Sequence, residues 1–184
     1  MRYIKYYENI DPFEEEWESE EPYTELEKWL LTKYPGENKW SEIRSLDCSR
    51  TELTSLEGIG NLRNLKRLDC YGNKLTSLKG IENLTNLRVF ICSRNKLTSL
   101  KGIENLEFLV DFSCNDNSLR SLYGIENLTN LEILFCHNNN LTSLDGIENL
   151  TNLHHIGCAN NKFKTEYKQY LRNYCYKNNI SFHI

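Results

Sequence analysis

Residues 87–106 read LRVFICSRNKLTSLKGIENL, and the same arrangement of Leu, Cys, Asn and Ile returns along most of the chain. Copies of this unit begin at Ile43, Leu65, Leu87, Leu109, Leu131 and, in truncated form, Leu153. Six cysteines follow one another at steps of 22 residues and so mark the period: Cys48, Cys70, Cys92, Cys114, Cys136 and Cys158. A fixed period of this length indicates stacked structural repeats.

The spacing within one unit predicts its local structure. The segment Leu-x-x-Leu-x-Cys ends in a period-2 alternation, which suits a short strand with one buried face. The later Leu and Ile residues recur every third position and predict a 3₁₀ turn. Because one unit cannot bury its apolar side alone, we expect an α/β solenoid. This is a right-handed superhelix with a parallel sheet on the concave face, 3₁₀ turns on the convex face and helical caps at both ends.

The unit Leu-x-x-Leu-x-Cys-x-x-Asn-x-Leu resembles the leucine-rich repeat family in its short 22-residue form, over about residues 43–163. It is similar to the repeats of internalins and of a protein-phosphatase regulatory subunit. The resemblance implies a non-catalytic module that binds a protein or peptide through its concave face. It also leaves a regulatory subunit of a phosphatase or another enzyme, an enzyme, and a surface adhesin as alternatives.

Three further rows repeat with the same period, and each has a structural explanation. An Asn row follows each strand and is expected to satisfy turn backbone groups, while a Gly row is expected at positions of positive φ. A Glu row of like charges should be exposed or point at turn amides. The rows are Asn73, Asn95, Asn117, Asn139 and Asn161; Gly58, Gly80, Gly102, Gly124 and Gly146; and Glu82, Glu104, Glu126 and Glu148.

The chain divides into three parts. Residues 1–42 form an acidic segment and a helical cap, residues 43–163 the six repeats, and residues 164–184 a helix–strand cap. Thr24 and Glu27 have the spacing of a capping box, which predicts a helix over about 23–34. The acidic, aromatic stretch 11–21 is either a solvated loop or a segment that docks on a basic patch of a partner.

The C-terminal tail predicts a helix from Thr165 with Tyr167, Tyr170, Leu171 and Tyr174 on one face. A final parallel strand should follow at residues 180–184, because Ile180 lies 22 residues after Cys158.

One cysteine per repeat matches neither a disulfide framework nor a zinc site, so we predict free thiols, no metal and no cofactor. Cys175 lies outside the period and is either the most reactive thiol or a buried one. The net charge of −4 argues against nucleic-acid binding, and no segment is apolar enough to cross a membrane. With no visible secretory signal, we expect a cytoplasmic protein, in the host cell if it is viral or an effector.

Positions between the core residues of each strand vary from unit to unit, so the binding surface should lie there. We predict an anchor of Tyr71, Ile91 and Phe135 within a surface formed by Arg67, Asp69, Tyr71, Val89, Ile91, Arg94, Asp111, Asp116, Ile133, Phe135 and His137. The alternative is that a cap, the N-terminal segment or a neighbouring molecule covers the apolar residues.

Catalytic residues are not predicted. Asp47 and Asp69 should be neighbours that raise one another's pKa, unless Arg67 neutralises the pair. The acidic N-terminal end and the basic C-terminal end suggest a monomer capable of weak head-to-tail association.

Overall fold

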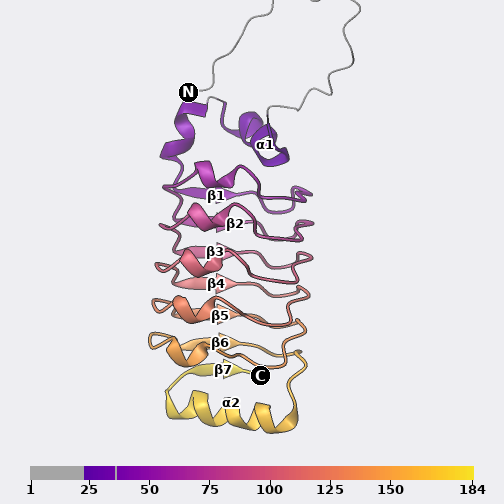
Figure 1. The fold of residues 1–184 in the computed structure, drawn as a ribbon, viewed down its shortest axis with the longest axis vertical. Helices are drawn as coiled ribbons and strands as arrows, with labels where there is room; N and C mark the ends of the chain where they lie inside the picture. Colours follow the sequence, from indigo (N-terminus) through magenta and orange to yellow (C-terminus); the bar gives the residue numbers. More distant parts are fainter. Residues whose placement is uncertain (1–22, 36) are drawn as a thin grey trace, which may run out of the picture.

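The computed structural model describes residues 23–35 and 37–184 and shows one parallel sheet with strands in chain order. The strands are β1 Ser45–Asp47, β2 Arg67–Asp69, β3 Val89–Ile91, β4 Asp111–Ser113, β5 Ile133–Phe135, β6 His155–Gly157 and β7 Ser181–His183. From β1 to β5, each strand pairs with the residues 22 positions further on in the next strand, as Leu46 does with Leu68. The coils stack in a nearly straight column, with the described termini at its two ends (Figure 1).

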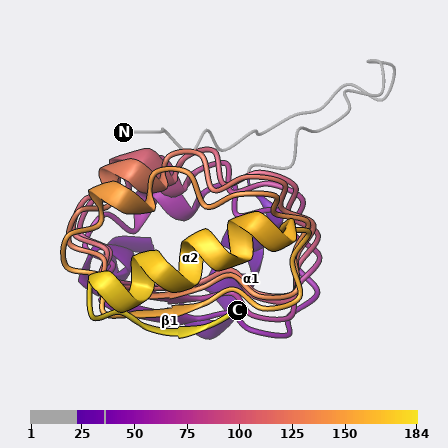
Figure 2. The same cartoon turned by 90° about the horizontal axis from the view of Figure 1, so that it is seen from below.

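A second layer of 3₁₀ turns lies opposite the sheet. These turns are η2 Ile59–Asn61, η3 Ile81–Asn83, η4 Ile103–Asn105, η5 Ile125–Asn127 and η6 Ile147–Asn149. Seen from below the column, the sheet forms one wall and the 3₁₀ turns the other (Figure 2). The predicted solenoid is therefore confirmed. We call the outer surface of the sheet, predicted to be concave, the sheet face.

The core fills the space between these two layers. The central residue of each of β1–β6 points inward, and Phe90 and Phe112 stack with ring centroids 5.6 Å apart. The six periodic cysteines lie in the same core with 0% exposure. Because every repeat places Leu, Ile and Cys at equivalent inward positions, the core is continuous from one end of the column to the other.

The predicted role of the Asn row is confirmed. The Asn139 side chain donates to the carbonyl oxygens of Cys114, Cys136 and His137 at 3.0–3.3 Å, and its Oδ1 accepts from Leu119 N–H at 3.0 Å. The bonds to Cys114 and Leu119 join it to the preceding coil. Each equivalent Asn makes the same link, so the row fastens successive coils where the chain leaves the sheet.

The Gly and Glu rows work together at the start of each 3₁₀ turn. Gly102 has φ of 107°, a left-handed conformation that side chains oppose, and its N–H donates to Glu104 Oε2 at 2.7 Å. The same bond recurs at Gly80, Gly124 and Gly146. The Glu side chains therefore accept hydrogen bonds from turn amides, so the row has a structural role and is not only a solvated charged edge.

Helix α1, Glu25–Lys33, covers the first coil. Its N-terminus has the predicted capping box, formed by Thr24 and Glu27. In the first repeat Gly60 stands where later units have Glu, and the Glu27 side chain accepts from Asn61 at 3.1 Å beside this turn. Lys33 Nζ donates to the Asp47 carbonyl oxygen at 2.7 Å, which occupies an acceptor on the outer edge of β1. A further 3₁₀ helix, η1 Glu37–Glu42, connects α1 to the repeats.

Helix α2, Thr165–Lys177, lies across the other end (Figure 2) and leads into β7. Tyr167 and Tyr174 bond to the backbone of the last repeat, as the predicted aromatic face requires. The predicted parallel strand is present, but the count that gave Ile180 the place of a cysteine is wrong. Phe182 pairs with Ile156, a step of 26 rather than 22, because a 13-residue helix replaces the shorter 3₁₀ turn.

Replacing Asn139 by Ala should lower the free energy of unfolding by about 2–4 kcal/mol, because it removes four hydrogen bonds and leaves buried backbone groups unpaired. Asn105→Ala is the matched control, since Asn105 is exposed, and should change stability by less than about 0.5 kcal/mol. Urea denaturation measures both. Equal losses in the two variants would contradict the role of the row.

Candidate protein-binding surface

The predicted binding residues lie in the strands or in the turns directly after them. Arg67, Asp69, Val89, Ile91, Asp111, Ile133 and Phe135 occupy the first and third positions of strands β2–β5, which face outward. Tyr71, Arg94, Asp116 and His137 follow the same strands. The structure therefore gathers these residues on one side of the column, while the 3₁₀ turns form the other side.

An apolar patch lies in the middle of the sheet face. We define it as Val89 and Ile91 of β3 together with Ile133 and Phe135 of β5, all half-buried. The Phe135 ring lies over Gly157, where an added Cβ would come within 2.8 Å of its Cδ1, and it meets the ring of His155 edge-on at 5.1 Å. Strand β4 runs between the two halves of the patch and contributes Asp111 and Ser113.

Asp111 is the exceptional residue of this surface. Val89 and Ile133 pair with it from the two neighbouring strands, and its Oδ1 atom is buried without a hydrogen-bond partner. Burial raises the pKa of the Asp111 carboxyl above its ordinary value, and the charge of Arg67 lowers it only in part. The apolar patch thus has an uncompensated carboxylate at its centre.

The polar residues towards β1 already have partners within the chain. The Tyr71 ring lies between the guanidinium groups of Arg50 and Arg94, at 5.4 and 5.6 Å from its centroid. Arg67 pairs with Asp69 at 3.5 Å. This region is a network of paired charges that positions the Tyr71 ring, and the role of Tyr71 as an anchor stays a prediction.

The expectation that Asp47 and Asp69 raise one another's pKa is wrong for Asp47. Hydrogen bonds from Ser49 hold the pKa of Asp47 below its ordinary value, and Lys33 and Arg67 add a smaller effect of the same sign. Asp69 is neutralised by Arg67, as the alternative foresaw.

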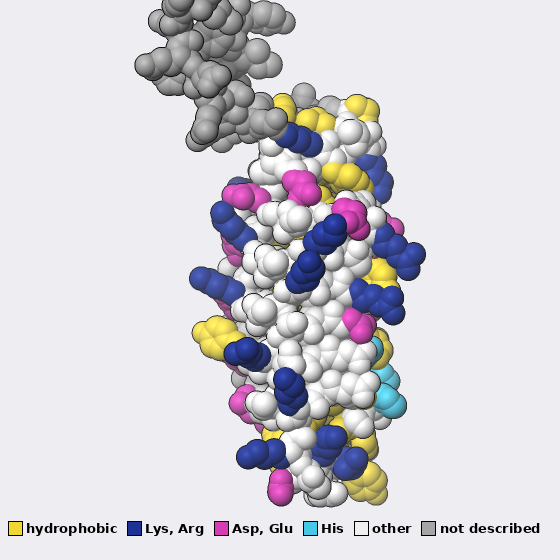
Figure 3. Space-filling view, turned by 90° about the vertical axis from the view of Figure 1, so that its right-hand side faces the viewer, with side chains coloured by type: hydrophobic (Ala, Val, Ile, Leu, Met, Phe, Trp, Pro, Cys, Tyr) yellow, Lys and Arg dark blue, Asp and Glu magenta, His cyan; other side chains and the backbone are white. Residues whose placement is uncertain are grey.

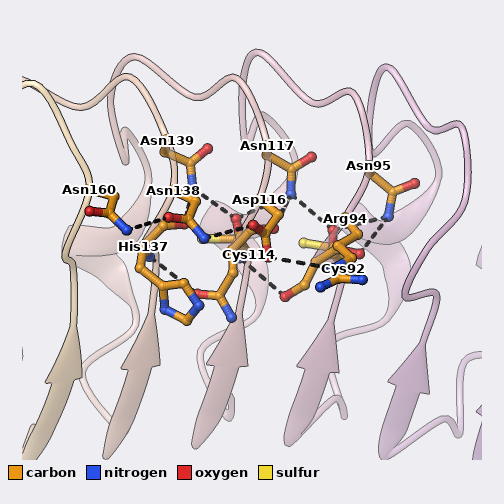
Figure 4. Close-up of polar contacts among 12 residues, drawn as sticks. Cys92, Arg94, Asn95, Cys114, Asp116, Asn117, His137, Asn138, Asn139 and Asn160 are labelled. Atoms are coloured by element: carbon orange, nitrogen blue, oxygen red, sulfur yellow. Dashed lines mark hydrogen bonds and ion pairs between the residues drawn. The ribbon is translucent and has the colours of Figure 1, made fainter.

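A second ladder of polar side chains runs beside the Asn row (Figure 4). Asn160 donates to Asn138 at 2.8 Å, Asn138 donates to Asp116 at 2.7 Å, and Asp116 lies 3.8 Å from Arg94. All four residues have φ of 53–55°, which turns their side chains out of the strand direction. Sequence reasoning found Arg94 and Asp116 but missed Asn138 and Asn160, although their 22-residue spacing was a usable signal.

Sequence reasoning also missed an exposed Phe and a mainly polar cleft at the margin where the strands begin. Phe108 is 53% exposed and, with Val110, lines a cleft of about 400 Å³ that Arg88, Asn130, Glu132 and Asn152 complete. Other units have Asn at the place of Phe108; Asn130, for example, donates to the Glu107 carbonyl oxygen at 2.8 Å. The departure from the repeat was visible in the sequence.

The side of the column formed by the turns after the strands has a different character. Separate Lys and Arg side chains stand out along it, and no continuous apolar area is visible between the two ends (Figure 3). Among the described residues, this side of the column therefore has no apolar patch comparable with that of the sheet face.

The environment of the cysteine thiols makes them unreactive in the folded protein. All seven cysteines are free and buried, as predicted for the periodic six, and Cys175 is only 1% exposed. Burial raises the pKa of Cys48 and of Cys158 to about 12, and it raises the pKa of Cys175 as well. Burial therefore keeps these thiols protonated and out of reach of solvent, and the cytoplasmic location stays a prediction.

Comparisons with known proteins agree with the fold. A family profile described as Leucine Rich repeats (2 copies) matches residues 41–84 and 129–167. A leucine-rich repeat protein of Leptospira interrogans is 32% identical over 68% of this chain, with a TM-score of 0.64. The chain belongs to the leucine-rich repeat family. No match was found among curated proteins.

Two Listeria monocytogenes structures are also similar. The functional domain of InlJ, described as including a cysteine ladder, is 29% identical over 70% of this chain, with a TM-score of 0.55. The internalin InlF is 22% identical over 74% of this chain with a TM-score of 0.58, which shows the fold alone; 48% of its own length is covered. The chain spans about a third of the Leptospira and InlJ structures, 33% and 32%.

The described part of the chain contains neither a metal-binding cluster nor a membrane-spanning helix. Within residues 23–35 and 37–184, no group of three or more His, Cys, Asp or Glu side chains could hold a metal ion. Neither described helix is long and apolar enough to span a membrane.

Thiol labelling tests the burial of the cysteines. Iodoacetamide at pH 8 should modify none of the seven thiols in the native protein and all seven after unfolding in guanidinium, because burial keeps them protonated and out of reach. Intact-mass spectrometry counts the adducts. Rapid native labelling, or missing adducts after unfolding, would show that the inward placement or the free state is wrong.

Replacing Asp111 by Val should raise the free energy of unfolding at pH 7 by about 1 kcal/mol, because it removes an unpaired buried acceptor and continues the Val89–Ile133 row. Asp69→Val is the control and should bring no gain, since Asp69 is paired with Arg67 and accepts from Tyr71 N–H.

The gain should also depend on pH. A raised pKa means that folded Asp111 binds its proton more tightly than the unfolded chain does, so its contribution is most favourable below the ordinary pKa of about 3.9 and worsens as pH rises. The advantage of Asp111→Val should therefore be largest at pH 7 and smallest near pH 3. Denaturation at both pH values measures it, and an equal gain at both would contradict the ionisation argument.

Proposed function

We propose that this protein is a non-catalytic module that binds a protein or peptide through its sheet face. The observation that supports this most strongly is the apolar patch, because packing of the solenoid does not require Val89, Ile91, Ile133 or Phe135 to be apolar. The equivalent outward positions hold Ser, Asp, Arg, His or Gly in the other units. Apolar side chains grouped on a solvent face are typical of interaction sites.

The surroundings of the patch support the same proposal. Paired charges border it towards β1, and the polar ladder of Arg94, Asp116, Asn138 and Asn160 runs along the ends of the strands. An apolar centre within a polar rim is the usual anatomy of a protein interface. Helices α1 and α2 lie at the two ends of the column (Figure 1), so neither described cap covers the patch. The acidic stretch 11–21 lies outside the described residues.

Membership of the family also supports a protein-binding function, since leucine-rich repeat proteins are generally interaction modules. Because the chain spans only part of its structural relatives, the partner of the whole protein is also a matter of proposal. No specific observation favours a phosphatase regulator, an enzyme or an adhesin over a general protein-binding module.

The binding face can be tested with peptides selected on the full chain from a random library displayed on phage. The double variant Ile91→Ala/Phe135→Ala should weaken the selected synthetic peptides by about a hundredfold, because it removes two apolar anchors. Fluorescence anisotropy measures the affinity. Since both side chains are half-buried, denaturation should show a stability loss of only about 1–2 kcal/mol.

Tyr123→Ala is the matched control, because Tyr123 is 74% exposed beside Gly124 at the start of η5, on the layer opposite the sheet. This variant should bind the peptides as the unmodified chain does. Affinity that survives the double variant, or that falls equally in the control, would contradict binding through the sheet face.

A further inference from the structure

We propose that the partner of the sheet face places a basic side chain, Lys or Arg, on the Asp111 carboxylate and apolar side chains on the patch around it. This inference rests on the proposed function and specifies the chemistry of the partner. The juxtaposition behind it is a half-buried carboxylate between Val89 and Ile133, with one oxygen that has no hydrogen-bond partner.

The other described aspartates of this surface differ from Asp111, because each already has a partner. Asp47 accepts from Ser49 N–H at 2.9 Å. Asp69 accepts from Tyr71 N–H and pairs with Arg67, and Asp116 accepts from Asn138 and pairs with Arg94. Asp111 Oδ1 is the one buried side-chain oxygen or nitrogen left unpartnered among the side chains of residues 23–35 and 40–184.

Within the part of the chain that the structure describes, no basic side chain forms an ion pair with Asp111. Arg67 is the one whose charge acts on Asp111, but it belongs to β2, two strands away, which corresponds to about 10 Å across a sheet. Arg67 is also engaged by Asp69. The desolvation of the Asp111 carboxylate is therefore uncompensated in the free protein, and a cation from a partner would compensate it.

The shape of the surface also favours a long basic side chain. Val89 and Ile133 border Asp111 on both sides and can contact the methylene stem of a Lys or Arg while its charged head reaches the carboxylate. Apolar residues next to it in the partner can then contact Ile91 and Phe135. Val110, adjacent in sequence to Asp111, leads to a mainly polar cleft at the margin, where the exposed Phe108 offers one further apolar contact.

The test uses the full chain and the phage-selected peptides. We expect the selected sequences to share one Lys or Arg flanked by apolar residues. The affinity of such a synthetic peptide should fall at least about tenfold on the isosteric variant Asp111→Asn, because a charged hydrogen bond is lost. Asp47→Asn should leave the affinity unchanged, since Asp47 lies on β1 and already has its own partners. Thermal unfolding confirms that each variant is folded.

The decisive experiment reverses the charge of residue 111 and of the basic residue in the peptide. Asp111→Lys should abolish binding of the basic peptide, and a peptide with Glu in place of its basic residue should bind Asp111→Lys better than it binds the unmodified chain. Peptides that need Ile91 and Phe135 but are indifferent to Asp111 would overturn this inference and leave the proposed function standing. Peptides indifferent to all three residues, or no enrichment at all, would count against both.

Discussion

Each coil of this chain is stable only when another coil lies against it, because a single 22-residue unit leaves one side of its Leu, Ile and Cys residues open. The Asn row is the interaction that sets how the coils meet. Each Asn satisfies backbone groups of its own turn and of the preceding coil, as Asn139 does with Cys136 and Cys114. A shift of one residue would break these bonds and turn the strand over, so the register of the whole column follows from this row.

This constraint also explains why we place the proposed binding function on the sheet face. Positions that contact the next coil are fixed by packing, whereas outward positions such as Ile91 and Phe135 are free to differ between units. Asp111 shows the consequence most clearly. An unpaired carboxylate between Val89 and Ile133 should lower the free energy of unfolding of the unbound protein. A residue that lowers stability and brings no structural benefit is best explained by a role in binding.

Much of the fold was predictable because the constant 22-residue spacing determines which residues of successive repeats lie side by side. The sheet, the 3₁₀ layer, the Asn row and the capping box at Thr24 all follow from spacing. The count of 22 failed only at Ile180, where helix α2 replaces a 3₁₀ turn and changes the step. The binding surface was less predictable. The partners of Tyr71 and the lack of one for Asp111 depend on how side chains of different coils meet, which spacing alone does not give.

The central claim is that the 22-residue period separates inward residues from outward ones along strands β1–β6. Hydroxyl-radical footprinting of the native chain, read by mass spectrometry, tests this directly on phenylalanines of neighbouring strands. Phe135 faces out and should be oxidised readily, whereas Phe90 and Phe112 are fully buried and should be protected until the protein is unfolded. Oxidation of Phe90 and Phe112 as fast as that of Phe135 in the native protein would contradict the account.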